Sequence, residues 1–300
     1  MKNLFLFFVF LLAFNFGFSQ SNLINAQKPS DIDLKASEET DDTFLKYDSI
    51  DLKDILWSKV VYEYIDLDQK LNFPLLFPLQ DDAYRASSRR SLWKTIFDGI
   101  MNDEITELYQ PDNDQFIDSY KVVDDPNTSE NEIKFLYEDG SGNYLKSSNI
   151  RGYNIKGIWY FDKVHSELRY RLLAIQPYGD EIKDIRNAQR RGEEVSKTIY
   201  HWIWYPSIRE ILHKSKVFND RNNNNVISFD ELLVNRRFNS FIYKYDNVYG
   251  NRSIENYISR KKDANGNFTE SEERHKMRLL LESERIKKEI LDFEIDMWGY

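Results

Sequence analysis

Residues 155–178 read IKGIWYFDKVHSELRYRLLAIQPY, and they decide the fold class. Two runs, Ile155–Asp162 and Leu168–Tyr178, are rich in β-branched, aromatic and alternating residues on either side of the short link KVHSE. This pattern is typical of two antiparallel strands joined by a tight connection. Thr198–Tyr205 (TIYHWIWY) predicts a third strand. We therefore expect a small antiparallel sheet in the middle of the chain.

Helices are expected on both sides of this sheet. Asp51 is a suitable N-cap for a helix through DILWSKVVYEYIDL, with Ile55, Val60 and Tyr64 among its apolar positions. Pro74 and Pro78 end that helix. The fold class that follows is α+β, a small antiparallel sheet flanked by helices at the N- and C-terminal ends of the mature chain.

Further helices follow from capping and spacing. Ser87 or Ser88 caps a helix in which Leu92, Ile96 and Ile100 recur at four-residue spacing. Pro206 opens a helix through SIREILHKSKVF, because its missing N–H costs nothing in a first turn.

Three later segments complete the expected elements. Gly179–Lys197 is a charged excursion that predicts either an exposed loop or a surface helix. Ser228 and Glu231 form a capping box that opens a helix through Tyr245. The last helix is expected from about Ser271 to Phe293, with a partly apolar stripe at Leu279, Glu282 and Ile286.

The N-terminus predicts export. A basic Lys2 precedes the apolar run Leu4–Phe14, and Gly17 and Ser19 occupy the small-residue positions of a cleavage site. We expect a signal peptide over residues 1–19 and a flexible acidic arm over 20–48. The remaining residues 49–300 would form a single α+β domain, with the possibility of an N-terminal helical half, 49–150, and a C-terminal half, 151–300.

Composition narrows the classes of function. The chain has no cysteine, which excludes a lipid attached to a processed N-terminal Cys, disulfides and thiolate metal sites. Residues 1–150 carry 14 basic and 27 acidic side chains, and residues 151–300 carry 27 and 23. The imbalance is either ordinary solvated surface or a basis for head-to-tail packing between copies. An acidic chain without a concentrated basic face argues against nucleic acid.

Enzyme signatures are mostly absent from the sequence. It contains no phosphate-binding glycine loop, no GxSxG elbow and no HExxH motif. The histidines lack a second ligand at metal spacing and are interpreted as structural; they are His165, His201, His213 and His275. The acidic pairs Asp81/Asp82 and Asp124/Asp125 are interpreted as solvated loop carboxylates. We expect no enzymatic activity and no cofactor.

One segment has the spacing of a calcium loop. Asp220, Asn222, Asn224, Ser228 and Glu231 fall at positions 1, 3, 5, 9 and 12 of such a loop. Position 6 is an asparagine where glycine is usual, and only the first and last of these residues bring charge. An Asn-rich turn followed by a capping box explains the same residues. A calcium-dependent binding module built on residues 220–231 therefore remains the alternative hypothesis.

The residues after this loop suggest a contact surface. Arginine and large aromatic side chains are over-represented in interface hot spots. An ordinary core-facing helical stripe would have the same spacing. The candidate interface residues are Arg236, Arg237, Phe238, Tyr243 and Tyr245.

Several ordered segments together resemble the GldN/PorN family. They are ILWSKVVYEYIDLDQKLNFPLLFP, GIWYFDKVHSELRYRLLAI, HWIWYPSIREIL, SFDELLVNRRFNSFIYKYDNVYG and the terminal LLESERIKKEILDFEIDMWGY. The resemblance covers nearly the whole chain after the expected signal peptide. That family serves gliding motility and the type IX secretion system.

The resemblance implies a periplasmic structural subunit. It implies assembly with a GldK/PorK-type outer-membrane lipoprotein into a ring under the outer membrane, with self-association in that ring. It also implies contact with a GldM/PorM-type periplasmic component that couples to an inner-membrane motor. The protein would be associated with the outer membrane peripherally, through its lipoprotein partner. The resemblance carries over no residue-level binding site.

Overall fold

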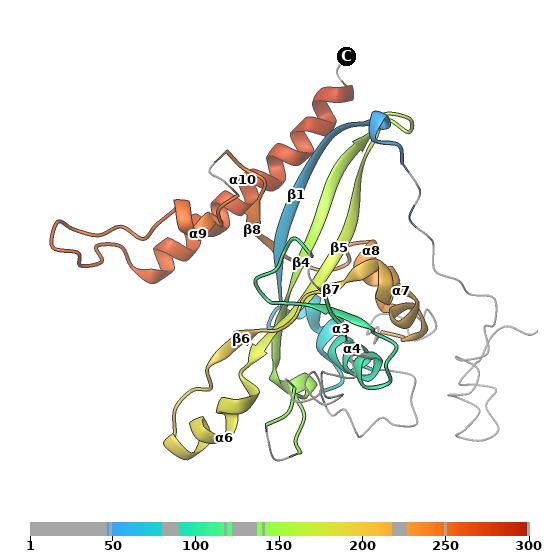
Figure 1. The fold of residues 1–300 in the computed structure, drawn as a ribbon. Coiled ribbons are helices and arrows are strands. Elements are labelled where there is room, and N and C mark those ends of the chain that lie inside the picture. The colour runs from blue at the N-terminus through green and yellow to red at the C-terminus, as the bar shows by residue number, and fades with distance from the viewer. Residues whose placement is uncertain are drawn as a thin grey trace, which may run out of the picture.

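An antiparallel sheet with helices packed against it forms the body of the molecule (Figure 1). The computed structural model describes residues 47, 50–79, 90–116, 119–121, 137–139, 142–217, 227–248 and 251–298. The predicted α+β class, a sheet with flanking helices, is confirmed. The expected signal peptide and nearly all of the expected acidic arm lie outside the described residues.

The main sheet has the strand order β6–β5–β4–β1–β8, and β7 also pairs with β5. All of these pairs are antiparallel. Its strands are β1 (Ile55–Asp66), β4 (Ile150–Asp162), β5 (Glu167–Asp180), β6 (Lys197–Ile199), β7 (Ile203–Trp204) and β8 (Phe241–Tyr245). A separate two-stranded sheet pairs β2 (Glu107–Tyr109) with β3 (Ser119–Lys121).

The helices differ widely in length. The α-helices are α3 (Phe73–Leu76), α4 (Leu92–Met101), α6 (Ile182–Arg191), α7 (Tyr205–Lys214), α8 (Phe229–Val234), α9 (Ile254–Tyr257) and α10 (Glu272–Trp298). Short 3-10 turns are η1 (Leu52–Asp54), η2 (Lys70–Asn72) and η3 (Ser147–Asn149). Within the described residues, no helix combines the length and apolar character needed to cross a membrane.

The predicted hairpin is confirmed and is longer than expected. β4 and β5 pair from Asp162 opposite Glu167 to Ile150 opposite Gly179. The Asp162 carboxylate closes the connection by accepting a hydrogen bond from the N–H of Val164 at 2.8 Å. The register of this pairing shifts at two places, between Ile150 and Gly152 and between Lys156 and Gly157. The long ribbon lets β1 pair along almost its whole length.

The helix expected after Asp51 is wrong, because Ile55–Asp66 is strand β1. Asp51 precedes only the short turn η1, and its side chain makes no capping hydrogen bond. The segment contains β-branched and aromatic residues at most positions, which favour a strand when partners are available on both sides. Here β4 and β8 supply those partners. Tertiary pairing therefore overrides the helical spacing of the apolar residues.

The α4 helix was predicted correctly, with a different cap. Ser91 is its N-cap, and its hydroxyl accepts a hydrogen bond from the N–H of Lys94 at 3.0 Å. Leu92, Ile96 and Ile100 are fully buried, as their spacing predicts. The expected caps Ser87 and Ser88 lie outside the described residues.

The expected third strand is divided. Lys197–Ile199 is β6 and Ile203–Trp204 is β7, so the strand is interrupted and Tyr205 already belongs to α7. Pro206 lies in the first turn of α7, as predicted. Between β5 and β6 the charged excursion forms α6, the surface-helix alternative.

The helix expected from Ser228 through Tyr245 is also wrong. The Ser228 hydroxyl accepts a hydrogen bond from the N–H of Glu231 at 3.1 Å, but α8 ends at Val234. Arg236 then takes a left-handed backbone conformation with φ of 51°, which stops helical propagation. Phe241–Tyr245 continues as strand β8, paired with β1.

Two apolar clusters cover one face of β1. Strand side chains alternate between faces, so Trp57, Val61 and Ile65 point to the same side. Val61 belongs to a cluster with α10, whereas Ile65 belongs to the larger cluster built with α4, α7 and α8. The opposite face carries Tyr62, which packs with Trp202 in a third cluster.

Candidate contact surface

The calcium-loop candidates are only partly described. Asp220, Asn222 and Asn224 lie outside the described residues. Glu231 lies in the first turn of α8, with its carboxylate 3.5 Å from the guanidinium of Arg237. Among the described residues, no group of three or more acidic, histidine or cysteine side chains could hold a metal ion. The calcium hypothesis stays a prediction from the sequence.

Arg236 forms an ion pair inside the protein. Its two terminal nitrogens donate hydrogen bonds to both carboxylate oxygens of Glu63 on β1, at 3.0 and 2.7 Å. Glu63 is buried and also accepts a hydrogen bond from the hydroxyl of Ser240. The Arg236 guanidinium lies 4.2 Å from the ring centroid of Tyr170. Burial lowers the pKa of Arg236, but Glu63 and Tyr170 both raise it, and the net pKa is above its ordinary value.

The other four candidate contact residues differ in how far their side chains are buried. Phe238 is buried in the cluster with α4, α7 and α8, and Tyr245 is buried beneath α10. Tyr243 on β8 is half-buried, and burial raises its pKa above the ordinary value. Arg237 differs from these residues, because about half of its side chain is exposed. Within this set, only Arg237 presents a substantially exposed side chain.

The helix α10 is fixed to the sheet by apolar and polar contacts. Ile286 of the predicted stripe is buried against β8 and β1, and so is Ile290, which the prediction did not include. The Ser283 hydroxyl accepts a hydrogen bond from the backbone N–H of Ile242 at 2.8 Å. The ring of Phe293 stacks on Trp57 with centroids 4.7 Å apart. These contacts hold α10 along the part of the sheet that carries β8 and β1 (Figure 1).

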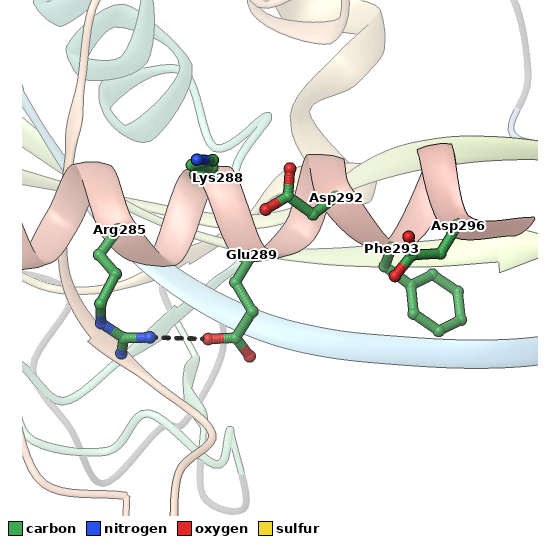
Figure 2. Close-up of a pocket in the computed structure, with 6 residues that line it drawn as sticks. All are labelled: Arg285, Lys288, Glu289, Asp292, Phe293 and Asp296. Carbon is green, nitrogen blue, oxygen red and sulfur yellow. Dashed lines mark hydrogen bonds and ion pairs between the residues drawn. The ribbon is translucent and has the colours of Figure 1, made fainter.

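A shallow depression of about 420 Å³ lies along α10 (Figure 2). Its lining consists of Arg285, Lys288, Glu289, Asp292, Phe293 and Asp296. Arg285 donates a hydrogen bond to Glu289 at 3.1 Å, drawn as the dashed line in Figure 2. Lys59 on β1 also pairs with Glu289, and this ammonium is the main reason that the Glu289 pKa is lowered. The depression therefore offers charges of both signs to a contacting segment.

The outward face of α10 carries large apolar side chains that sequence reasoning missed. Met277, Leu281, Leu291 and Ile295 are each more than half exposed. Together with Glu284 and Lys288 they form what we call the outward row, spaced alternately by four and three residues. The signal for this row in the sequence is a second stripe at helical spacing on the same helix. Apolar rows of this kind mark protein contact sites.

Two buried carboxylates, Asp162 and Asp230, have partners of their own. The His165 ring nitrogen lies 2.7 Å from the Asp162 carboxylate, and this hydrogen bond is the main cause of the lowered Asp162 pKa. Asp230 accepts hydrogen bonds from Arg209 at 2.8 and 2.9 Å in the interface between α7 and α8. Such arrangements stabilise packing. On the surface of α10, exposed apolar side chains lie beside charges of both signs.

Comparison with known proteins identifies one family. The family model described as gliding motility associated protein GldN matches residues 50–299. The match begins just before β1 and extends past the end of α10. No curated protein matches the chain.

Proposed function

Because the chain belongs to the GldN family of gliding motility associated proteins, we propose that it is a structural subunit of the type IX secretion and gliding machinery. In this proposal it works in the periplasm and joins a GldK/PorK-type outer-membrane lipoprotein in a ring. It also contacts the GldM/PorM-type component, which couples the ring to an inner-membrane motor. The observation that carries the proposal is the family match over residues 50–299.

The polar contacts between α10 and the sheet support a scaffolding role. A subunit that transmits force between partners needs contacts that resist sliding of a helix over its sheet. Lys59 on β1 pairs with Glu289 on α10, and Lys287 donates a hydrogen bond to the carbonyl of Ser240 at 2.6 Å. Polar contacts of this kind fix one relative position, which apolar packing alone specifies less strictly.

Its surface also supports assembly with other proteins. The outward row places large apolar side chains in water, and the depression beside it carries both charge signs. Interfaces between proteins combine an apolar centre with a polar rim in this way. The acidic first half and basic second half of the sequence favour contacts between unlike surfaces of neighbouring copies.

We infer that the contribution of this chain is structural and needs neither catalysis nor a cofactor. The buried charged side chains already serve the fold. Glu63 is committed to Arg236, and Asp230 is committed to Arg209 and to the hydroxyl of Tyr205. A general acid or base would need a carboxylate that faces a substrate, whereas these two face their own ion-pair partners.

Reconstitution with the lipoprotein tests the proposal. The purified protein is mixed with a GldK/PorK-type lipoprotein in detergent and examined by size-exclusion chromatography and electron microscopy at low and moderate salt. A large complex with ring-shaped particles is expected. An unrelated outer-membrane lipoprotein in the same detergent is the control. If the two proteins elute separately at both salt concentrations, the proposed assembly is wrong.

A further inference from the structure

The outward row of α10 has the spacing of a two-helix contact. Met277, Leu281, Glu284, Lys288, Leu291 and Ile295 recur at intervals of four and three residues, which places them on one line along the helix. The four apolar members are more than half exposed, and Glu284 and Lys288 are exposed as well. The opposite line of α10 is already used, because Ile286 and Ile290 are buried against the sheet.

The sequence positions of the row are symmetric about a centre at position 286, midway between its first and last residues. Met277 lies nine residues before that centre and Ile295 nine residues after it. Leu281 and Leu291 lie five residues before and after it. The innermost positions, two residues on each side, carry opposite charges, since one is Glu284 and the other is Lys288. Read in either direction, the row is apolar, apolar, charged, charged, apolar, apolar.

We propose that the outward row binds the same row of a second copy of this chain, with the two helices antiparallel. A two-fold contact requires a surface that is complementary to itself, and the symmetric row meets that requirement. Met277 would meet the partner's Ile295, and Leu281 would meet the partner's Leu291. The row spans about 27 Å at 1.5 Å per residue, long enough for several successive layers of contact.

The charges select the antiparallel orientation. In it, Glu284 faces the partner's Lys288 on both sides of the axis. A parallel pair would instead place Glu284 against the partner's Glu284 and Lys288 against the partner's Lys288, which is unfavourable. Among the described residues Lys288 has no ion-pair partner, and Glu284, whose side chain is exposed, pairs with the half-buried Lys287 at 2.9 Å. Both charges are therefore accessible to a second copy.

The residues that flank the row are already neutralised within each copy. Arg285 would approach the partner's Arg285 near the axis, but each is held by its own Glu282 at 2.7 Å and Glu289 at 3.1 Å. Lys287 is held by the carbonyl of Ser240 at 2.6 Å. The like charges that meet near the axis thus belong to local ion pairs and hydrogen bonds, which reduces their mutual repulsion.

This contact is distinct from the proposed ring and does not depend on it. A two-fold contact closes on itself and joins only two copies, whereas a ring needs contacts between unlike surfaces. In a ring, the α10 contact would link subunits in pairs or join two layers. It also predicts a dimer of the purified protein without any partner present.

Charge exchange at the centre of the row tests both the contact and its orientation. We would measure dimerisation of the purified protein by sedimentation equilibrium. Glu284→Lys alone places two Lys pairs at the axis, and Lys288→Glu alone places two Glu pairs there. Each variant should dimerise at least about tenfold more weakly than wild type. An equimolar mixture of the two variants should associate again, because each unlike pair is restored in the heterodimer.

The matched control is Glu255→Lys, the same charge change at an exposed residue of α9 outside the row. It should leave dimerisation unchanged. Circular dichroism should report unchanged folding for all variants, since the substituted side chains are exposed. The proposal is overturned if wild type stays monomeric at its highest soluble concentration, or if the mixture associates no better than its components.

Cysteine cross-linking provides an independent readout, because the natural chain contains no cysteine. The double variant Leu281→Cys/Leu291→Cys should form a covalent dimer under mild oxidation. The two sulfurs of one chain lie about 15 Å apart along the helix, too far for an internal disulfide. The single variant Leu281→Cys should not cross-link in the antiparallel arrangement. Efficient cross-linking of the single variant would indicate a parallel pair and overturn the proposal.

Discussion

Arg236 and Glu63 form a buried ion pair that joins two segments 173 residues apart in sequence, with hydrogen bonds of 3.0 and 2.7 Å. On β1, Glu63 lies between Val61, which packs beneath α10, and Ile65, which packs against the helices α4, α7 and α8. The pair therefore lies where the two apolar clusters of one sheet face meet. It fixes the chain between α8 and β8 to the centre of the sheet.

Removal of this arginine should destabilise the fold strongly. Arg236→Ala leaves the Glu63 carboxylate buried without its cation, which costs about 3 kcal/mol or more. We expect the free energy of unfolding, measured by urea denaturation, to fall by that amount. The control is Arg237→Ala, whose half-exposed side chain should change stability by less than about 0.5 kcal/mol. Equal effects of the two substitutions would contradict the assignment.

Of the two neighbouring arginines, Arg237 is the one to test for contact with a partner protein. Arg237→Glu should leave the free energy of unfolding nearly unchanged, because the Arg237 ion pair with Glu231, at 3.5 Å, is exposed. If Arg237 contacts a partner, the variant should weaken assembly with the lipoprotein. Normal assembly together with normal stability would remove Arg237 from the contact surface.

Two glycines should respond differently to the addition of a methyl group. A Cβ at Gly179 would collide with the backbone carbonyl of Asn149, so Gly179→Ala should destabilise the protein by about 1–3 kcal/mol. A Cβ at Gly99 in α4 would meet side-chain carbons only, those of Ile105 at 3.0 Å and the end of Ile211 at 3.4 Å. Alanine also favours a helix over glycine by about 1 kcal/mol, so Gly99→Ala should be close to neutral. Thermal unfolding of both variants measures the difference, and equal losses would contradict the packing described.

Stability should fall as the pH drops below neutrality, in part through His201. Burial lowers the pKa of His201 from its ordinary value of 6.5, so the folded state disfavours the charged imidazole. The unfolded chain binds the proton first, and the His201 contribution is therefore lost as the pH falls from 6.5 towards the lower folded pKa. His201→Phe should reduce this slope in urea unfolding measured between pH 7 and 5.5. An unchanged slope would mean that His201 is not responsible.

Calcium should not bind to this protein if the Asn-rich turn serves only to start α8. Calorimetric titration with millimolar Ca²⁺ should then give a flat response. A saturable heat that disappears in the variant Asp220→Ala would establish the alternative, a calcium-dependent module. Glu231→Ala is less informative, because it also removes an exposed ion pair with Arg237.

Local sequence signals were sufficient to predict four parts of the fold, namely the hairpin, α4, α7 and α10. Alternation marks β4 and β5, and Pro206 marks the start of α7. Strand β1 could not be predicted in this way. Its apolar residues fit a helix as well as a strand, and the choice depends on β4, whose paired residues lie from Asp66 opposite Gly152 to Ile55 opposite Asp162, about 90 to 110 positions later.

The contact residues illustrate the same limit. Arg236, Phe238 and Tyr245 have the composition of an interface, yet Arg236 pairs with Glu63 and the other two are buried. The residue type alone does not show whether a side chain contacts another protein or packs inside its own. That depends on which strand pairs with the segment. The outward row of α10 was accessible from spacing alone, because Met277, Leu281, Leu291 and Ile295 have strict heptad positions.

The most direct test of the central claim, that this chain is a subunit of the secretion and gliding machine, is affinity purification from gently solubilised membranes. The tagged protein should bring with it a GldK/PorK-type lipoprotein and a GldM/PorM-type component, identified by mass spectrometry against an untagged strain. Recovery of the tagged protein without either component, while known complexes in the same preparation stay intact, would contradict the account.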